Sequence, residues 1–528
     1  MLRRTWFLWL MALIVGWGFD LLFWNHIGGL GYFLWTAIIL LSLFTYTLCK
    51  GVKPSWRSIL LGVLTLAAAF IVFWRSEPVT ILAGVGLSLF LGGLLFTTFN
   101  NGYWIFYRIR DFFMTFLRWY WAAFSRPFGL KQELPPVEGE ALTPKRKIVG
   151  SLILGVILAL PVVLVLTALL ASADMIFSQR LQEFFTLFDL EHLPEYLFRL
   201  FYVVFVTFLM AGSLLHAAAP KHIEDHPLKR QETIKPFLGS IETMVILVSV
   251  TILFLIFVVI QFQYLFGGEA NINAAGYTYS EYAVKGFSEL VAVAVISLLL
   301  YQGLATISRR ESSGQRTAFT VFSALMMGLV LVILVSSFQR LALYENAYGF
   351  SRLRAYTHFF IPWLGVLILA VIGLEIARRQ RWFALSLLVC TVGFGATLAI
   401  VNVDGFIARQ NLIRYQQGEV LDIQYLAGLS YGATPALAAG LETIQADAKT
   451  YASLGAVLAC QRADLQAHQD QPWQLINLSS IKASQSLSSI ETLLQEYPTS
   501  SDKGILGVQV DGEWVPCASL VDYSDLMD

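Results

Sequence analysis

Residues 241–262 read IETMVILVSVTILFLIFVVIQF, a run of 22 residues with a single charge. A helix needs about 20 mostly apolar residues to cross the hydrocarbon core of a bilayer. Backbone N–H and C=O groups find no water in lipid, so such a run must form a helix with internal hydrogen bonds. The stretch therefore predicts a transmembrane helix, and it determines the fold class that we expect for the chain.

The same pattern recurs along most of the sequence. Hydrophobic residues make up 57% of the 528 residues and charged residues 14%, whereas soluble globular proteins carry roughly 25% charged residues. This balance excludes a disordered chain, a secreted disulfide scaffold and an ordinary soluble enzyme. We predict an all-α polytopic membrane protein with about eleven transmembrane helices. The predicted spans cover residues 5–24, 29–49, 58–74, 78–98, 148–171, 196–217, 241–262, 282–304, 317–337, 358–377 and 382–403.

Lys and Arg residues are distributed unevenly between the predicted spans. Segments on the side of the N-terminus hold 23 of them and segments on the opposite side hold 7, while 6 follow the last span. Because cytoplasmic segments carry an excess of Lys and Arg, we predict a cytoplasmic N-terminus and an extracytoplasmic C-terminus. The first span ends in bulky residues such as Phe23 and Trp24, which predicts a retained anchor and not a cleaved signal peptide.

The spacing of the apolar runs divides the chain into four predicted regions. The first is an N-terminal four-helix membrane region that ends in a cytoplasmic interfacial helix rich in aromatic residues. A cytoplasmic linker, a seven-helix membrane core and an acidic C-terminal domain follow. Their predicted bounds are residues 1–130, 131–147, 148–403 and 404–528.

Residues 404–528 differ from the rest of the chain in charge and in pattern. They hold 15 acidic and 6 basic residues, whereas the chain as a whole has no net charge. Short helical patterns are followed by Ile505–Val510 and Glu513–Cys517, which flank Asp511-Gly512. Such a dipeptide between two alternating runs predicts a β-hairpin with a two-residue turn. We therefore expect a small, mostly helical domain with a terminal β-hairpin.

Ionisable residues near the predicted extracytoplasmic boundary form a candidate polar cluster. Its three arginines need anionic partners, and Glu281, Lys285 and Glu289 are spaced so that they would share one helix face. Glu289 would lie inside the apolar layer, where an acid is costly unless paired and is a functional candidate by default. The alternative is an internal salt bridge that locks helix ends together. The cluster comprises Asp174, Glu281, Lys285, Glu289, Arg340, Arg352, Arg354, Asn402 and Asp404.

Two other acids, Asp20 and Glu375, lie near the ends of predicted spans, and we expect them at the interface. The sequence has no phosphate-binding Gly-rich loop with Lys, no nucleophile elbow and no Cys-x-x-Cys. We therefore predict no enzymatic activity, no cofactor, no metal and no nucleic-acid partner. Cys460 and Cys517 both lie in the tail, and an extracytoplasmic location would allow a disulfide between them.

Several stretches together resemble a bacterial polytopic membrane family known as domain of unknown function 4173, with the related 4153 group. The similarity runs from about residue 150 to about residue 480. Members often carry a basic residue where this chain has Lys285. The resemblance implies a protein of the bacterial inner (cytoplasmic) membrane, and it brings no substrate or catalytic residue. The matching stretches are Ser172-Ala-Asp174, Tyr264-Leu-Phe-Gly-Gly268, Tyr279-x-Glu281-Tyr282, Gly286-Phe287-x-Glu289-Leu290, Leu343-Tyr344, Tyr348-Gly349-x-x-x-Leu353-Arg354, Asn402-x-Asp404-x-x-Ile407-Ala408-Arg409-x-Asn411, Tyr425-Leu426 and Pro435-Ala436.

Three functions are compatible with these features. The first is transport or sensing through an outward-facing polar cluster. The second is an envelope scaffold or assembly protein, anchored in the lipid bilayer, that binds an envelope protein through its acidic tail. The third is a membrane enzyme acting on lipid or cell-wall precursors. A solvent-connected cavity lined by Glu289, Arg352 and Arg354 would favour the first, whereas sealed ion pairs would favour the second.

Overall fold

The residues that the computed structural model describes make up most of the chain. They are residues 2–26, 28–133, 155, 159, 162–163, 166–167, 169–187, 193–219, 236–265, 286–444, 447–468, 471–502 and 504–520. The chain forms two compact units, which we describe separately. Unit 1 comprises residues 1–66, 90–102 and 113–221, and unit 2 comprises residues 67–89, 103–112 and 222–528.

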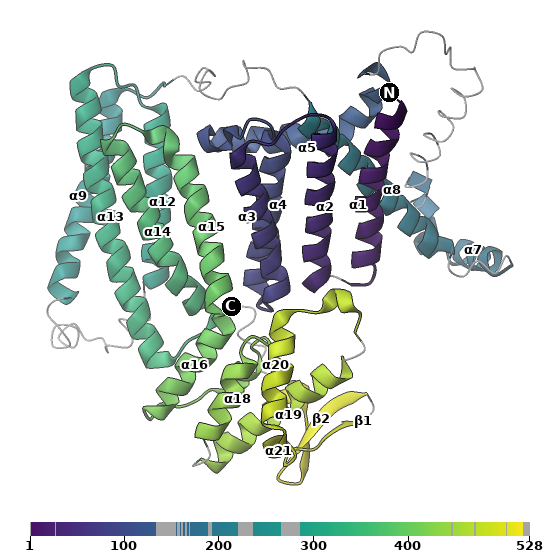
Figure 1. The fold of residues 1–528 in the computed structure, drawn as a ribbon. Coiled ribbons are helices and arrows are strands. Elements are labelled where there is room, and N and C mark those ends of the chain that lie inside the picture. Colours follow the sequence, from purple (N-terminus) through teal and green to yellow (C-terminus); the bar gives the residue numbers. More distant parts are fainter. Residues whose placement is uncertain are drawn as a thin grey trace, which may run out of the picture. The chain divides into compact units, whose positions relative to one another are not determined.

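Ten helices within the described residues are long and apolar enough to cross a membrane, which confirms the predicted fold class. The predicted span over residues 148–171 falls mostly outside the described residues. Figure 1 shows the helices in sequence colours. They are α1 (Leu2–Phe23), α2 (Gly29–Cys49), α3 (Trp56–Trp74), α4 (Pro78–Thr98), α8 (Leu193–Ala218), α9 (Ser240–Leu265), α12 (Phe287–Ile307), α13 (Ser313–Tyr348), α14 (Arg352–Ile376) and α15 (Phe383–Val401).

Two further helices flank these spans. The helix α5 (Ile109–Glu133) covers most of the predicted interfacial helix, and α7 (Met175–Leu187) precedes α8. Short 3₁₀ turns occupy Tyr103–Phe106, Gln380–Trp382, Trp473–Leu475 and Cys517–Leu520.

In unit 1, α1 packs against α2 and α8. The contact is close at Gly16, where a Cβ would lie 2.1 Å from the Thr207 hydroxyl. Asp20, near the end of α1, is buried at this contact. Arg199 of α8 binds its carboxylate at 2.7 Å, and Tyr202 donates a further hydrogen bond. A buried carboxylate needs such partners, and both come from a helix 179 residues further along the chain.

The membrane helices of unit 2 are organised around α13, which packs against α9, α12 and α14, while α14 also packs against α15. A capping box between Ser312 and Gln315 starts α13, and Gly349 ends it. Its 36 residues correspond to about 54 Å, well beyond the roughly 30 Å of a hydrocarbon core. The residues after the predicted end at 337 therefore continue the helix instead of forming a loop.

Glu375, near the end of α14, is also buried within its unit. The Tyr301 hydroxyl of α12 donates a hydrogen bond to it at 2.7 Å. The Thr320 hydroxyl of α13 donates another at 2.9 Å. One carboxylate thus ties three helices together, which explains why it is found inside the unit.

The C-terminal part of unit 2 is mostly helical and ends in a small sheet. The confirmed hairpin joins β2 and β3 through Asp511 and Gly512, whose φ angles of 53° and 85° suit a type I′ turn. A strand that the sequence did not predict, β1, pairs antiparallel with the other side of β2. The elements are α16 (Val403–Gln416), α17 (Ile423–Ala427), α18 (Thr434–Thr443), α19 (Ala448–Ala467), α20 (Leu478–Ser489), α21 (Glu491–Leu494), β1 (Thr499–Asp502), β2 (Ile505–Val510) and β3 (Glu513–Pro516).

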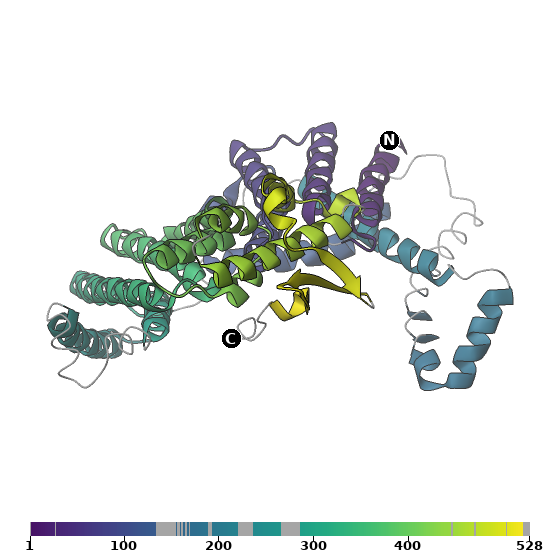
Figure 2. The same cartoon turned by 90° about the horizontal axis from the view of Figure 1, so that it is seen from below.

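The sheet packs on α19, and Figure 2 shows its strands in yellow beside the C-terminal helices. Gly507 of β2 leaves room for the ring of Trp514 on β3, because a Cβ there would lie 2.3 Å from that ring. Cys460 of α19 and Cys517, just after β3, form a disulfide. The crosslink joins residues 57 positions apart and fastens the end of the sheet to the helix.

One hydrophobic core continues from the ends of the membrane helices into the C-terminal part. Ala355 of α14 and Leu398 of α15 belong to the same buried cluster as Ile407, Leu437 and Leu458. The segment after residue 403 is therefore packed on the ends of α14 and α15 and does not hang from a linker. The division into four predicted regions remains a prediction.

Candidate functional site

The candidate site lies in unit 2, where α15 ends and the chain turns into α16. Asn402 makes this turn in the left-handed conformation, with φ 57°, which Asn tolerates better than most residues. Its side-chain oxygen accepts a hydrogen bond from the Gly405 N–H at 3.1 Å and so caps α16. Its amide nitrogen donates to the Gly432 carbonyl at 2.8 Å. Asn402, one of the predicted cluster residues, thus fixes the direction of α16.

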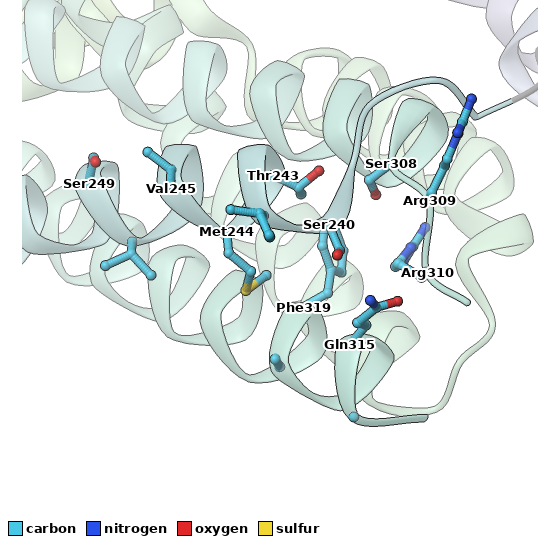
Figure 3. A pocket seen from close by; sticks show the side chains of 14 residues that line it. Ser240, Thr243, Met244, Val245, Ser249, Ser308, Arg309, Arg310, Gln315 and Phe319 are labelled. Carbon is cyan, nitrogen blue, oxygen red and sulfur yellow. The ribbon is translucent and has the colours of Figure 1, made fainter. Parts of the chain in front are cut away.

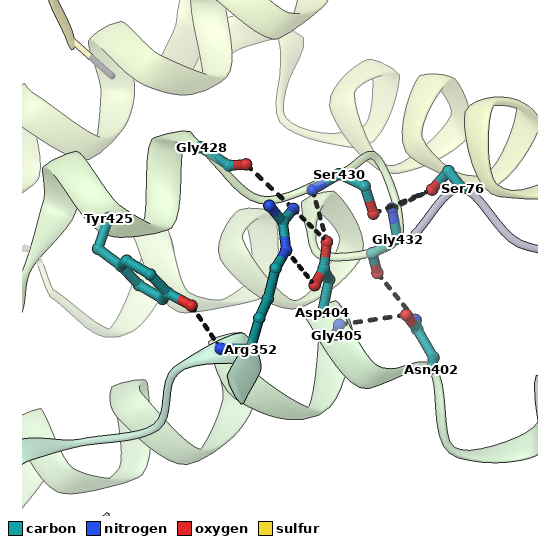
Figure 4. A network of polar contacts seen from close by, with 9 residues as sticks. All are labelled: Ser76, Arg352, Asn402, Asp404, Gly405, Tyr425, Gly428, Ser430 and Gly432. Carbon is teal, nitrogen blue, oxygen red and sulfur yellow. Dashed lines mark hydrogen bonds and ion pairs between the residues drawn. The ribbon is translucent and has the colours of Figure 1, made fainter. Parts of the chain in front are cut away.

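Arg352 and Asp404 form the centre of the site (Figure 4). Arg352 is the first residue of α14, and Asp404 lies in the first turn of α16. The guanidinium binds both carboxylate oxygens, with Nε 3.1 Å from Oδ1 and Nη2 2.8 Å from Oδ2. This two-point contact is the strong form of an arginine–carboxylate pair.

The backbone after α16 closes the pair. The Ser430 N–H donates to Asp404 Oδ2 at 2.7 Å, and Arg352 Nη2 donates to the Gly428 carbonyl at 3.1 Å. The Tyr425 hydroxyl accepts a hydrogen bond from the Arg352 N–H at 2.6 Å. Burial raises the pKa of Tyr425, so this hydroxyl stays neutral. The two charged groups are therefore held by protein groups from three segments.

Burial distinguishes this pair from a surface salt bridge. The Asp404 side chain has no solvent exposure, and the Arg352 side chain is 20% exposed. Both carboxylate oxygens have hydrogen-bond donors, so burial leaves neither unsatisfied. Removing one partner of such a pair typically costs about 3–5 kcal/mol, because the other charge remains buried. The arrangement is a sealed joint between α14, α16 and the segment around Ser430.

The short connection between α3 and α4 also contributes to the site, which the sequence did not predict. Arg75 donates from Nε to the Ala399 carbonyl at 2.6 Å and from Nη2 to the Ile400 carbonyl at 3.2 Å. These carbonyls belong to the last turn of α15, which has no helical partners for them. The Ser76 hydroxyl bonds the Ser430 hydroxyl and accepts from the Gly432 N–H, each at 3.1 Å.

Glu77, in the same connection, is a second buried acid of the site. Its side chain is fully buried, and neither carboxylate oxygen accepts a hydrogen bond from another side chain among the described residues. Burial, and then the negative charge of Asp404, raise the pKa of Glu77. Only Asp404 of the two acids has a two-point contact with an arginine. The site thus combines an arginine-bound carboxylate with a second buried acid, Glu77, whose pKa is raised.

The helix face predicted for Glu281, Lys285 and Glu289 is interrupted. α12 begins at Phe287, and Gly286 before it has φ 99°, so a single helix does not run through this point. Glu281 and Lys285 lie outside the described residues. Glu289 is exposed in the first turn of α12 and accepts a hydrogen bond from the Ser288 hydroxyl at 2.9 Å.

Three other predicted residues make contacts of their own, and none of these contacts involves Asp404. Arg340 is buried on α13, with its guanidinium beside Gly286. Arg354 donates to the Gly349 carbonyl at 2.5 Å and covers the Tyr344 ring at 4.1 Å. Asp174 is exposed in unit 1, where it accepts hydrogen bonds from two N–H groups at the start of α7. Of the predicted cluster, the structure brings together Arg352, Asn402 and Asp404.

The residues that the sequence did not predict carried a weak signal. Arg75-Ser-Glu77 is a three-residue polar break between two apolar runs, and so short a connection must stay at the ends of its helices. Tyr425 belongs to one of the stretches that resemble the family. Within the described residues, no group of three or more His, Cys, Asp or Glu residues is arranged to hold a metal ion.

A family model described as Domain of unknown function (DUF4153) matches residues 60–440. The chain belongs to this family. The match includes Arg75, Glu77, Arg352 and Asp404, so the whole polar joint lies inside the DUF4153 region. It is the 4153 group of the resemblance that is matched. Among curated proteins and among solved structures, no match was found.

Proposed function

We propose that this DUF4153 protein is a non-enzymatic scaffold of the bacterial cytoplasmic membrane that presents a rigid, acidic C-terminal domain to envelope proteins. The observation that carries the proposal is the sealed Arg352–Asp404 pair. A transport or sensing site needs polar groups that water or a ligand can reach. Here the carboxylate is fully buried, and Arg352 and the Ser430 N–H bind its two oxygens.

Rigid attachment of the domain supports a presenting role. The C-terminal helices share their core with α14 and α15, and the Ser479 hydroxyl of α20 donates to the Trp74 carbonyl of α3 at 3.0 Å. A domain fixed at several points keeps one orientation relative to its membrane helices. A partner then binds without first ordering the domain, which lowers the entropic cost of association.

The charge of the domain indicates the chemistry of its partner. Most of its exposed ionisable residues are acidic, and opposite charges accelerate and orient association. We therefore expect a partner with a basic surface. Exposed acidic residues of the domain include Glu419, Asp422, Glu442, Glu491, Asp511 and Glu513.

We also propose a cytoplasmic N-terminus and an extracytoplasmic C-terminus. The distribution of Lys and Arg supports this orientation. The Cys460–Cys517 disulfide supports it independently, since disulfides persist in oxidising compartments and are rare in the cytosol.

Photocrosslinking in intact cells tests the proposal. A photoreactive amino acid would replace Val420, which is 89% exposed beside Glu419, or Glu442 on α18. Leu253, exposed on the membrane helix α9, serves as the matched control. We expect a discrete protein product from the two domain positions that is weakened when Glu419 is replaced by Lys.

Two outcomes would contradict the scaffold. The first is the absence of a protein product from both domain positions under conditions where the full chain is present in the membrane. The second is an Asp404→Asn variant that keeps normal yield and stability but loses its cellular effect. That second result would favour transport or sensing, because a purely structural pair cannot be removed without loss of stability.

A further inference from the structure

A pocket of about 590 Å³ lies at the other end of the unit 2 helices, where α9 and α13 begin and α12 ends. The segments leading into these helices are joined. The Phe237 N–H donates to the Ile307 carbonyl at 3.0 Å, and the Arg309 N–H donates to the Leu238 carbonyl at 2.8 Å. Three helix ends and two linked segments thus frame the pocket (Figure 3).

Two arginines line one end of the pocket without an acidic partner among the described residues. Arg309 donates from Nε to the Pro236 carbonyl at 2.9 Å, and Arg310 donates from Nη2 to the Ala305 carbonyl at 2.5 Å. The Arg310 guanidinium also lies 4.3 Å from the Phe319 ring centre. Each guanidinium has five N–H donors, so these contacts orient both groups and leave donors for an anion.

Ser308 provides an independent sign of a missing ligand. It lines the same pocket, is only 4% exposed, and its hydroxyl has no hydrogen-bond partner among the described residues. An unsatisfied buried hydroxyl costs about 1–3 kcal/mol, and native structures rarely contain one without a reason. Ser308 thus adds an unused hydroxyl to the pocket end that Arg309 and Arg310 line.

The rest of the pocket follows the membrane helices and is mostly apolar, although Ser240, Thr243, Ser249 and Gln315 also line it. Met244, Val245 and Val248 of α9 and Phe319 of α13 line it, and Val245 is exposed. From Ser240 to Val248 the pocket extends along α9 by about 12 Å. A polar end at the helix termini and an apolar wall along the span match a phosphate headgroup followed by an acyl chain.

We propose that this pocket binds an anionic phospholipid, whose phosphate contacts Arg309, Arg310 and Ser308 and whose acyl chain lies against α9 and α13. Basic pockets between membrane helices bind anionic headgroups in this way. The site is separate from the Arg352–Asp404 joint, so it stands whether or not the scaffold proposal holds.

Native mass spectrometry of the delipidated full-length protein tests the site. Phosphatidylglycerol, phosphatidylcholine and glycerol 3-phosphate are added in turn. We expect retention of phosphatidylglycerol with a preference of about tenfold over phosphatidylcholine, and no retention of glycerol 3-phosphate at the same concentration. Equal retention of the two lipids would overturn the proposal, as would retention of glycerol 3-phosphate comparable to that of the lipid.

Variants separate the pocket from general electrostatic attraction. The double change Arg309→Gln and Arg310→Gln should weaken phosphatidylglycerol binding about tenfold or more. The matched control is Arg378→Gln with Arg379→Gln, which removes the same charge from the exposed connection after α14. An equal effect of the two pairs would overturn the site.

Ser308→Ala gives a test that does not change charge. We expect weaker binding of phosphatidylglycerol, with a melting temperature of the delipidated protein that is unchanged or higher, because the hydroxyl has no protein partner to lose. Unchanged lipid binding would contradict the role of Ser308, and a lower melting temperature without lipid would indicate a structural role instead.

Discussion

Arginine residues lie at both ends of the unit 2 helices, and the two ends differ in whether the chain provides an acidic partner for them. At the start of α14, the Arg352 guanidinium binds the buried Asp404 carboxylate and the Gly428 carbonyl, and the Ser430 N–H donates to the same carboxylate. At the start of α13, Arg309 and Arg310 contact backbone carbonyls and have no acid among the described residues. The comparison shows that an arginine at a helix end can serve either an internal ion pair or the binding of a ligand. What matters is whether the chain supplies the counter-charge or leaves it to another molecule.

The strongest way to break this contrast is to remove the internal counter-charge. Asp404→Asn leaves Arg352 largely buried without an anion, so we expect a loss of about 3–5 kcal/mol in the free energy of unfolding. Thermal or denaturant unfolding of the purified full chain measures it. Glu419→Gln is the control, because this exposed acid lies 3.5 Å from Arg414 and should contribute less than about 1 kcal/mol. Similar losses in both variants would show that the buried Arg352–Asp404 pair contributes no more to stability than an exposed ion pair does.

The Cys460–Cys517 disulfide is a second contact that stabilises the C-terminal domain, in addition to the Arg352–Asp404 pair. Replacing both Cys460 and Cys517 by Ser should cost about 2–4 kcal/mol, mainly in the sheet, because the reduced chain gains conformational freedom. Limited proteolysis of the full chain should then cut near β1–β3 before it cuts elsewhere. Cys49, which is a free and exposed cysteine, gives the matched Cys→Ser control. Resistance equal to that of the control would contradict this role.

Glu77, close to the Arg352–Asp404 pair, should make the stability of the folded chain depend on pH. Its pKa is raised above the ordinary 4.5 by burial, so the unfolded chain releases the proton more readily than the folded one. The protonated acid therefore contributes its full stability below about pH 4.5, and that contribution is lost as the pH rises through the higher folded value. Each unit of difference corresponds to about 1.4 kcal/mol.

Glu77→Gln should remove this part of the pH dependence. We expect the variant to match the wild type at pH 4.5 and to be more stable at neutral pH, measured from unfolding curves of both proteins across that range. Parallel curves for the two proteins would mean that Glu77 has the same pKa in the folded and the unfolded chain, which would contradict a pKa raised by burial.

The smallest effect on the free energy of unfolding is expected at the pocket that Arg309 and Arg310 line. Arg309→Gln removes a cation that has no acidic partner among the described residues and one hydrogen bond to a carbonyl. In lipid-free detergent the free energy of unfolding should change by less than about 1 kcal/mol. A loss comparable to that of Asp404→Asn would reveal an internal partner and remove the difference between the two ends.

The spans were predictable because lipid imposes one requirement on every crossing. The expected span over residues 382–403 differs from α15 (Phe383–Val401) by two residues at most. The local turn chemistry of Asp511-Gly512 was equally readable. The strand Thr499–Asp502 was not, because TSSD has no apolar alternation and its order comes from pairing with β2.

The site was only partly predictable because ion pairs depend on tertiary packing. The sequence offered four acids for Arg352, and the choice of Asp404 requires the turn at Asn402, 50 residues further along. The sequence predicted that Glu289 would lie inside the apolar layer on one helix face with Glu281 and Lys285. However, α12 begins only at Phe287, after Gly286. Glu77 was missed because only the basic residue of its short connection entered the topology argument.

The left-handed turn at Asn402 also sets a limit on how this protein can vary. A residue inserted there would rotate α16 by about 100° about its axis and shift it by about 1.5 Å. Asp404 would then point away from Arg352, and the carbonyls that receive Asn402 and Arg352 would lose their donors together. Length changes should therefore be tolerated between elements elsewhere but not at this junction, where the count of residues is itself part of the architecture.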